Sequence, residues 1–322
     1  MNVTAAPPPD AAPGRPLRAR LLQAAVAIVL IGLVVRLAGA REILHLLKST
    51  DPAGLAAAAG LYLLVSTLRG LRLAVLGSLP IKRAILASTA AQAAVQTVPV
   101  RLGELALPAL LKRHAGVPLT RGMGILLTVR ALDLAGLGTW AGAAIALRWG
   151  ADRPLILGAS VALVLPLLLL PAVAAAGERL AIRCLAPRGP RGRQWTRRAS
   201  QLRSTLDELR RSSGRLAAAM VLTILVWCGI WTIIHILLRA TGFAWPLATV
   251  IVGAAAATVA TFLPVNILGN IGTLEAGWTA GFAALGIPLE TAAATGVAVH
   301  VWSLLVAAAV GAAAYFLLTR RR

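Results

Sequence analysis

Long apolar runs alternate with short basic segments along most of this chain. A helix needs about 20 predominantly apolar residues to cross the hydrocarbon core of a bilayer, and several of the runs reach this length. We therefore expect an all-α fold, a polytopic bundle of membrane helices. The apolar pattern predicts spanning helices over residues 21–35, 53–68, 123–147, 154–174, 216–238 and 291–318.

Two further apolar segments are interrupted by proline, glycine and amide side chains. Residues 84–98 are apolar but short and stop at Pro99, after which residues 105–111 lead back to a basic segment. This pair is better explained as a re-entrant hairpin from the cytoplasm than as one span. Residues 246–285 must also return to the side from which they came, because the last helix ends in a basic tail. The second hairpin is therefore predicted to enter from the opposite side.

The composition of the chain places these segments in lipid. Hydrophobic residues make up 58% of the chain and the mean hydropathy is +0.81. Charged residues make up 13%, and about 25% is usual for a soluble domain. The net charge of +21 would suggest nucleic acid for a soluble protein, but the basic residues lie mostly between the apolar runs. That placement fits the positive-inside rule and attraction to anionic lipid headgroups, so we expect no nucleic-acid partner.

Basic clusters set the predicted topology. Residues 1–20 form a basic tail that is predicted to be disordered, and residues 319–322 form a second basic tail. Residues 178–215 form a loop with eleven arginines, so this loop and both termini are expected in the cytoplasm. Leucines at helical spacing in residues 197–211 fit either a helix that lies on the membrane or a plain solvated helix. The cations taken to mark a further cytoplasmic segment after residue 68 are Arg69, Arg72, Lys82 and Arg83.

Two parts of the chain look like copies of one another. The copies read VPVRLGE at 98–104 and GVPL at 116–119, then IGTLE at 271–275 and GIPL at 286–289. Twelve residues after the proline of each GxPL step lies an ionisable residue, Arg130 in the first copy and His300 in the second. Duplicated apolar segments of this kind indicate a transporter built from repeats, with its site where the repeats meet. Together with the topology, they predict two repeats of inverted orientation, over about 53–147 and 216–318.

Ionisable residues inside the repeats are the candidate site, because charge at membrane depth is unfavourable enough that function is the default explanation. The residues expected to bind substrate are Arg101, Glu104, Arg130, Asp133, Glu275 and His300. The residues expected to break the hairpin helices are Pro99, Gly103, Pro264 and Gly272. Structural alternatives stay open, namely local pairing of neighbouring basic and acidic residues and a packing role for the histidine.

No catalytic, metal or cofactor motif is found in the sequence. Cys184 and Cys228 form no metal or disulfide pattern, and no phosphate-binding loop, HExxH zinc motif or nucleophile elbow is present. We therefore expect a protein that is not an enzyme and that has no cofactor and no metal. A lipid-modifying transferase with its site in the membrane stays a third option, which the absence of a catalytic motif disfavours.

The PVRLGE motif at 99–104, the two GxP steps, the Arg130 and Asp133 pair and the GTLE element resemble the lysylphosphatidylglycerol synthase transmembrane family. This is the flippase-like membrane region of the multiple peptide resistance factor proteins. The resemblance implies an eight-helix-type protein of the bacterial inner membrane that moves a modified phospholipid or glycolipid between leaflets. The chain departs from the family pattern at His300, where an arginine is frequent, and Ser303 stands where repeat one has Asp133. It ends at Arg322, so we expect no aminoacyltransferase domain.

Two classes of function fit these features. In the first, Arg101 and Arg130 hold a lipid phosphate, and Glu104 and Glu275 receive a cationic headgroup or a coupling proton. The lipid would be an anionic or aminoacylated phospholipid, or a polyprenyl lipid or glycolipid. In the second, the protein is a non-transporting scaffold of a lipid or envelope-glycan assembly pathway, and its basic loop recruits a partner. A lipid-synthesis enzyme and a second copy of the chain are the protein partners considered.

Overall fold

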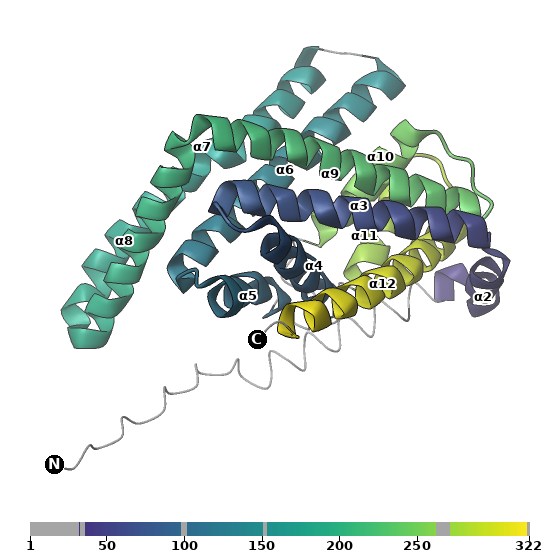
Figure 1. The fold of residues 1–322 in the computed structure, drawn as a ribbon. Helices are drawn as coiled ribbons and strands as arrows, with labels where there is room; N and C mark the ends of the chain where they lie inside the picture. Colours follow the sequence, from purple (N-terminus) through teal and green to yellow (C-terminus); the bar gives the residue numbers. More distant parts are fainter. Residues whose placement is uncertain (1–31, 33–35, 98–101, 151–152, 262–270, 321–322) are drawn as a thin grey trace.

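A computed structural model describes residues 32, 36–97, 102–150, 153–261 and 271–320 of the protein, and every regular element in them is a helix (Figure 1). The all-α prediction is confirmed. The first part of the chain contains α2 (Ala40–Ser49), α3 (Pro52–Gly77), α4 (Ile81–Thr97), a 3₁₀ turn (Leu102–Leu105), α5 (Ala106–Ala115) and α6 (Leu119–Trp149). The second contains α7 (Arg153–Cys184), a 3₁₀ turn (Ala186–Arg188), α8 (Gly189–Arg211), α9 (Ser213–Ala240), α10 (Leu247–Ala260), α11 (Thr273–Ala283) and α12 (Leu289–Thr319). The predicted tail 1–20 and most of the first predicted helix, 21–35, lie outside the described residues.

Four of the described helices are long and apolar enough to cross a membrane. They are α3, α6, α9 and α12, with 26 to 31 residues each. At 1.5 Å per residue, such lengths exceed the roughly 30 Å of hydrocarbon in a bilayer. The chain is therefore a multi-pass membrane protein. By contrast, α4, α5, α10 and α11 have 17, 10, 14 and 11 residues, and each is too short to span alone.

The two GxPL steps adopt the same backbone. Gly116 and Gly286 have φ angles of +69° and +85°, in the left-handed region that favours glycine. Pro118 and Pro288 follow with extended backbone and immediately precede α6 and α12. The two long helices that carry Arg130 and His300 therefore start from equivalent turns.

Helices of the two parts pack against one another in corresponding pairs. α3 lies along α9 at the centre of the molecule, α4 packs on α12, and α10 packs on α6 (Figure 1). Glycines permit these close approaches, because a Cβ on Gly229 would lie 2.4 Å from Val65 and one on Gly311 would lie 2.0 Å from Ala93. We call α3–α6 the first quartet and α9–α12 the second quartet. Because their helices pack against one another, the two quartets form a single helical bundle.

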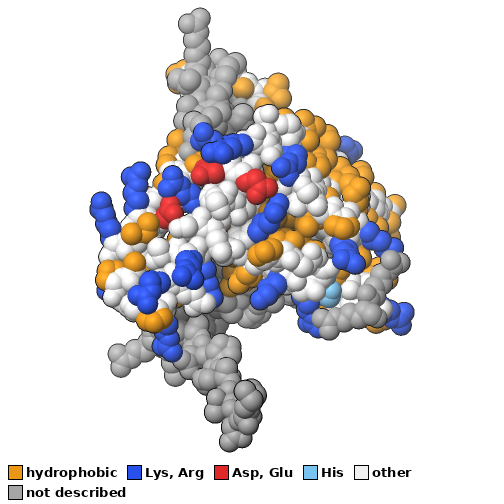
Figure 2. Space-filling model, turned by 60° about the vertical axis from the view of Figure 1, so that its left-hand side comes forward, with side chains coloured by type: hydrophobic (Ala, Val, Ile, Leu, Met, Phe, Trp, Pro, Cys, Tyr) orange, Lys and Arg blue, Asp and Glu red, His pale blue; other side chains and the backbone are white. Residues whose placement is uncertain are grey.

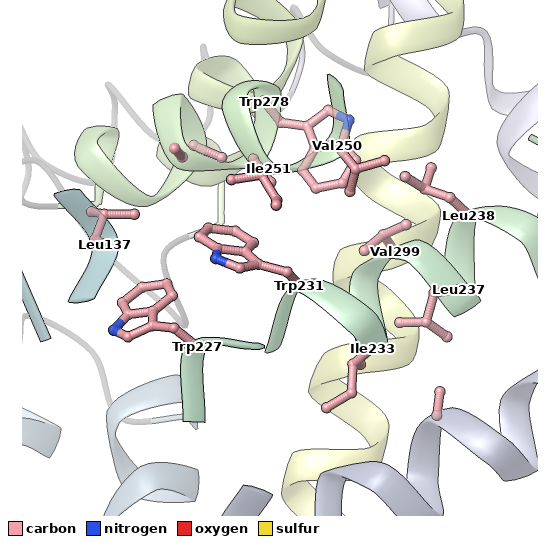
Figure 3. Packing of buried hydrophobic residues seen from close by; sticks show 14 of the residues in the cluster. Leu137, Trp227, Trp231, Ile233, Leu237, Leu238, Val250, Ile251, Trp278 and Val299 are labelled. Atoms are coloured by element: carbon pink, nitrogen blue, oxygen red, sulfur yellow. The ribbon is translucent and has the colours of Figure 1, made fainter. Parts of the chain in front are cut away.

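An aromatic core lies beside the central helices, where α9, α10, α11 and α12 meet (Figure 3). Trp227 and Trp231 of α9 stack with ring centroids 5.1 Å apart, and Trp278 of α11 packs with Phe282 at 4.6 Å. Large, rigid aromatic side chains bury much area with little loss of rotamer freedom. This core therefore stabilises the packing of the second quartet.

The Arg-rich segment is mostly helix, and its leucine stripe faces protein. α8 follows α7 along the flank of the molecule and also contacts α6 (Figure 1). Leu206 and Leu209 are buried, and Thr205 lies against Gly124 of α6. The expected membrane-lying or solvated stripe in 197–211 is therefore replaced by tertiary packing, which a hydrophobic period alone does not distinguish from lipid contact. Many basic and few acidic side chains are spread over the face in Figure 2.

Candidate functional site

A buried arginine beyond the end of the predicted span 53–68 helps to organise the first quartet. Arg72 of α3 is 3% exposed, and its Nη1 lies 2.6 Å from Oδ1 of Asp133 on α6. The same nitrogen donates to Oγ1 of Thr223 on α9 at 3.0 Å. Arg72 is therefore buried among the helices of the protein. The predicted end at residue 68 is too early, because α3 continues to Gly77 and these partners compensate the charge of Arg72. The cytoplasmic position of this end of α3 stays a prediction.

A glutamate and an arginine face each other in the first quartet. Glu104 in the turn before α5 has Oε2 3.6 Å from Nε of Arg130, which lies on α6. Arg130 also lies 3.9 Å from Asp133, so Asp133 is shared between two arginines. The side chains of Arg130 and Glu104 are 33% and 32% exposed. This pair is loose and both side chains are about a third exposed, although Nε of Arg130 itself is buried and forms no hydrogen bond.

A glutamate and a histidine face each other in the second quartet. Oε1 of Glu275 on α11 lies 2.6 Å from Nδ1 of His300 on α12. Its Oε2 accepts a hydrogen bond from the Gly272 backbone N–H at 2.6 Å, which satisfies a donor at the start of α11. Gly272 has φ +89°, so this break favours glycine. Both side chains are buried.

The two pairs occupy corresponding places in the chain. In each, a glutamate near the start of the second short helix meets the residue twelve positions after the helix-starting proline. The candidates Glu104, Arg130 and Asp133 thus come together in one group, and Glu275 and His300 in another. Ser303, at the place of Asp133, has no carboxylate to bridge a second cation. The first group therefore contains two arginines and two acids, and the second contains one acid and one histidine.

Three predicted residues, Pro99, Arg101 and Pro264, lie outside the described residues. Gly103 is described and buried, and a Cβ there would lie 2.2 Å from the carbonyl oxygen of Ala94 on α4. A side chain at this position would push the turn away from α4. Gly103 therefore permits the close approach that holds Glu104 in place.

A cavity of about 260 Å³ lies between the two quartets. Its polar lining includes Arg69 of α3, Gln96 of α4 and Ser303 of α12. The residues that complete its lining are Ala58, Tyr62, Val65, Trp227, Ile230, Ile233, Ile234, Leu237, Thr258, Thr261, Leu274, Trp302 and Val306. The cavity is thus mostly apolar with a few polar groups, as ligand sites commonly are. Across the described part of the chain, no group of three or more His, Cys, Asp or Glu residues could hold a metal ion.

Comparison with known families agrees with this architecture. The family described as "Lysylphosphatidylglycerol synthase TM region" matches residues 20–311. The chain belongs to this family. It is therefore a membrane protein of a lipid-related family, with its ionisable groups inside the matched region. Neither the curated proteins nor the solved structures include a match to this chain.

Arg69 and Arg72 lie within α3, beyond the predicted end of the span at residue 68. Both follow a long apolar run, and a first charge after such a run predicts the end of a span. The signal that gives the end of the helix is the turn sequence Gly77-Ser78-Leu79-Pro80, which follows them. Ser78 has φ +53°, and proline at position 80 precedes α4, so the helix ends there and not at the first arginine.

Proposed function

We propose that this protein exchanges a polar lipid between the two leaflets of the bacterial inner membrane, without nucleotide hydrolysis of its own. The observation that carries the proposal is the pair of corresponding contacts between a glutamate and a basic side chain, Glu104 with Arg130 and Glu275 with His300. Ionisable groups at membrane depth are rare and mark substrate pathways or proton relays. A non-transporting scaffold does not need ionisable pairs at corresponding positions of the two quartets.

Repeated architecture supports the same function. The partner helices α4 and α12 correspond to the partner helices α10 and α6, as expected if two related halves meet around a central axis. We propose that the halves are inverted repeats and that each pair of short helices is a re-entrant hairpin. In transporters of this kind the site lies near the midplane between the repeats, and it opens to one face at a time.

Lipid headgroups are large polar objects, and their unaided passage through hydrocarbon is strongly unfavourable. The glutamates and their cations offer alternative partners for a charged headgroup as it passes. The loose pair, 3.6 Å apart and a third exposed, is the one that a headgroup can enter first. The acyl chains would remain in the surrounding lipid while the headgroup moves through the protein.

Purified protein in liposomes tests the proposal. Vesicles with fluorescent lipids are treated with an impermeant reductant, which bleaches inner-leaflet label only if the lipid crosses the membrane. Bleaching should be faster with the protein, and the Glu104→Gln and Glu275→Gln variants should bleach at nearly the protein-free rate. Glu290→Gln is the matched control, because Glu290 is an exposed acid on α12. Equal bleaching with and without the protein, for anionic, cationic and polyprenyl lipids and with or without a proton gradient, would favour a scaffold.

The proposed orientation has its own test. We propose that both termini and the segment 178–215 face the cytoplasm, because cytoplasmic segments carry an excess of Lys and Arg. A Ser200→Cys variant, in a background without Cys184 and Cys228, should resist an impermeant thiol reagent in intact cells. Labelling of that cysteine from outside would overturn the orientation.

A further inference from the structure

Arg69 projects into the cavity from a single face of α3. Ala58, Tyr62, Val65 and Arg69 follow one another at steps of three and four residues, so they lie on one side of that helix. The opposite wall comes from α9, with Trp227 and Leu237 among its residues. A guanidinium thus lies between the two central helices, in a cavity whose lining is mostly apolar.

The other interior cations have acidic partners, but Arg69 does not. Arg72 and Arg130 share Asp133, Arg130 also faces Glu104, and His300 faces Glu275. Among the described residues, none forms an ion pair or a hydrogen bond with Arg69. The segments 98–101 and 262–270 contain no Asp or Glu in their sequence. Asp133 attracts Arg69 electrostatically without forming an ion pair with it, and Asp133 is already shared between Arg72 and Arg130. The positive charge in the cavity is therefore only partly compensated.

An uncompensated charge away from water is strongly unfavourable, so an interior arginine without a partner points to a ligand that supplies the negative charge. We propose that the cavity binds the phosphate of an anionic phospholipid, and that Arg69 is its phosphate ligand. The proposal rests on the lipid exchange proposed above and names the class of lipid. A cationic, aminoacylated headgroup is disfavoured at this position, because like charges repel and the nearby carboxylates are already paired.

The chemistry of the cavity lining fits a lipid phosphate rather than a free phosphate ion. A guanidinium donates two parallel hydrogen bonds to phosphate oxygens, which ammonium groups do not match geometrically. Gln96 and Ser303 offer further polar groups, and the apolar walls suit the glycerol and first acyl carbons. The volume of about 260 Å³ suits a headgroup more than a whole phospholipid, so the acyl chains would extend outside. An inorganic phosphate ion would leave the apolar walls without a partner.

Native mass spectrometry of the purified protein tests this inference without any need for transport. The protein is titrated with short-chain phosphatidylglycerol, lysyl-phosphatidylglycerol and phosphatidylcholine, and the first bound lipid is counted. We expect phosphatidylglycerol to bind at least about tenfold more tightly than the other two, and Arg69→Gln to remove that preference. Arg239→Gln is the control, because Arg239 is an exposed cation on α9. Inorganic phosphate is added as a competitor and should not displace the lipid.

Thermal unfolding separates a binding arginine from a structural one. If Arg69 awaits a ligand, Arg69→Gln should leave the lipid-free protein as stable as the parent or more stable. Added phosphatidylglycerol should then stabilise the parent and not the variant. Arg69→Lys keeps the charge but loses the two-pronged geometry, and it should bind with intermediate affinity.

Each outcome has a defined meaning. Loss of stability in lipid-free Arg69→Gln, equal binding of cationic and anionic lipids, or full displacement by inorganic phosphate would overturn the inference. Anionic preference that depends on Arg69, in a protein that does not speed exchange in liposomes, would support the site and refute the proposed transport. Lipid exchange that is lost in Glu104→Gln but unchanged in Arg69→Gln would support the proposed transport and overturn the phosphate site at Arg69.

Discussion

The two quartets place equivalent glutamates in unequal surroundings. Glu104 lies 3.6 Å from Arg130 with both side chains about a third exposed, whereas Glu275 lies 2.6 Å from His300 with both buried. The glutamate faces an arginine in the first pair and a histidine in the second. The two quartets thus hold an open contact and a closed contact at corresponding places.

This difference indicates how two similar halves can do different work. A charged headgroup can compete for partners at the open contact, because loose and partly solvated ion pairs contribute little stability. The closed contact also caps the start of α11 through Gly272, so breaking it disturbs the fold as well as the charge. If the protein exchanges lipid as proposed, we expect the first half to bind and release the headgroup and the second half to stabilise the packing of the two halves.

The largest loss of stability is expected on substitution of Asp133, the acid for which the second half has no equivalent. Asp133→Ala leaves the buried guanidinium of Arg72 without its carboxylate, and loss of one partner from a buried pair costs about 3–5 kcal/mol. Thermal unfolding in detergent should therefore show a large loss of stability. Ser303→Ala, at the equivalent place on α12, is the control and should unfold like the parent. A small loss at Asp133 would mean that the first half does not depend on its charge network.

Smaller losses of stability, unequal between the two halves, are expected when either glutamate is replaced by alanine. Glu275→Ala loses two short contacts at a buried site and should cost about 2–3 kcal/mol of unfolding free energy. Glu104→Ala should cost less than about 1 kcal/mol, because its contact is long and partly solvated. Chemical denaturation of both variants in the same detergent measures the difference. Equal losses would contradict the contrast between an open and a closed pair.

Glycines close to the two glutamates give a further test of the comparison: Gly103 directly precedes Glu104, and Gly272 lies three residues before Glu275. Gly272→Ala must adopt a left-handed backbone, which costs roughly 1–2 kcal/mol. Gly103→Ala instead places a methyl group against the backbone of α4, which cannot shift as a flexible side chain would. We expect Gly103→Ala to lose lipid exchange through displacement of Glu104, and Gly272→Ala to lose stability first. Thermal unfolding and the liposome assay, run on both variants, separate the two effects.

Much of this arrangement could be predicted from sequence because it depends on local spacing. The all-helical fold follows from the apolar runs, and the equivalent turns at Gly116 and Gly286 follow from two GxPL steps. The twelve-residue interval from proline to cation also marked Arg130 and His300 as equivalent. Both then meet a glutamate, although which atoms meet, and how closely, depends on tertiary packing.

The parts that sequence could not supply depend on distant partners. A charge after an apolar run predicts that the span ends before Arg72, whereas Asp133 and Thr223 compensate this arginine from other helices. The leucines of α8 form a stripe that fits lipid, water or protein, and only the packing of α8 on its neighbours distinguishes them. Inverted orientation of the repeats remains a prediction.

The smallest loss of stability is expected in the segment that joins the two halves, where a peripheral ion pair, with side chains 43% and 14% exposed, gives a reference for the interior ones. Nη1 of Arg203 on α8 lies 2.6 Å from Oε2 of Glu178 on α7, beyond the predicted span 154–174. Hydrogen bonds from Arg203 and Ser200 lower the pKa of the Glu178 carboxyl below its ordinary value of 4.5. Because the folded-state pKa is the lower one, this contact stabilises the protein fully above about pH 4.5. The contribution is lost as the pH falls through the folded-state value.

Melting temperatures measured between pH 7 and pH 3 check this expectation. Arg203→Gln should melt slightly below the parent at neutral pH, and the two curves should converge as Glu178 becomes protonated. The decrease at pH 7 should be far smaller than that of Asp133→Ala, because solvent and salt screen the peripheral pair. Arg198→Gln is the control, since Arg198 lies on the same helix over the ring of Trp195. A decrease as large as that of Asp133→Ala would show that the connecting segment, rather than the interior charge network, governs the stability of the fold.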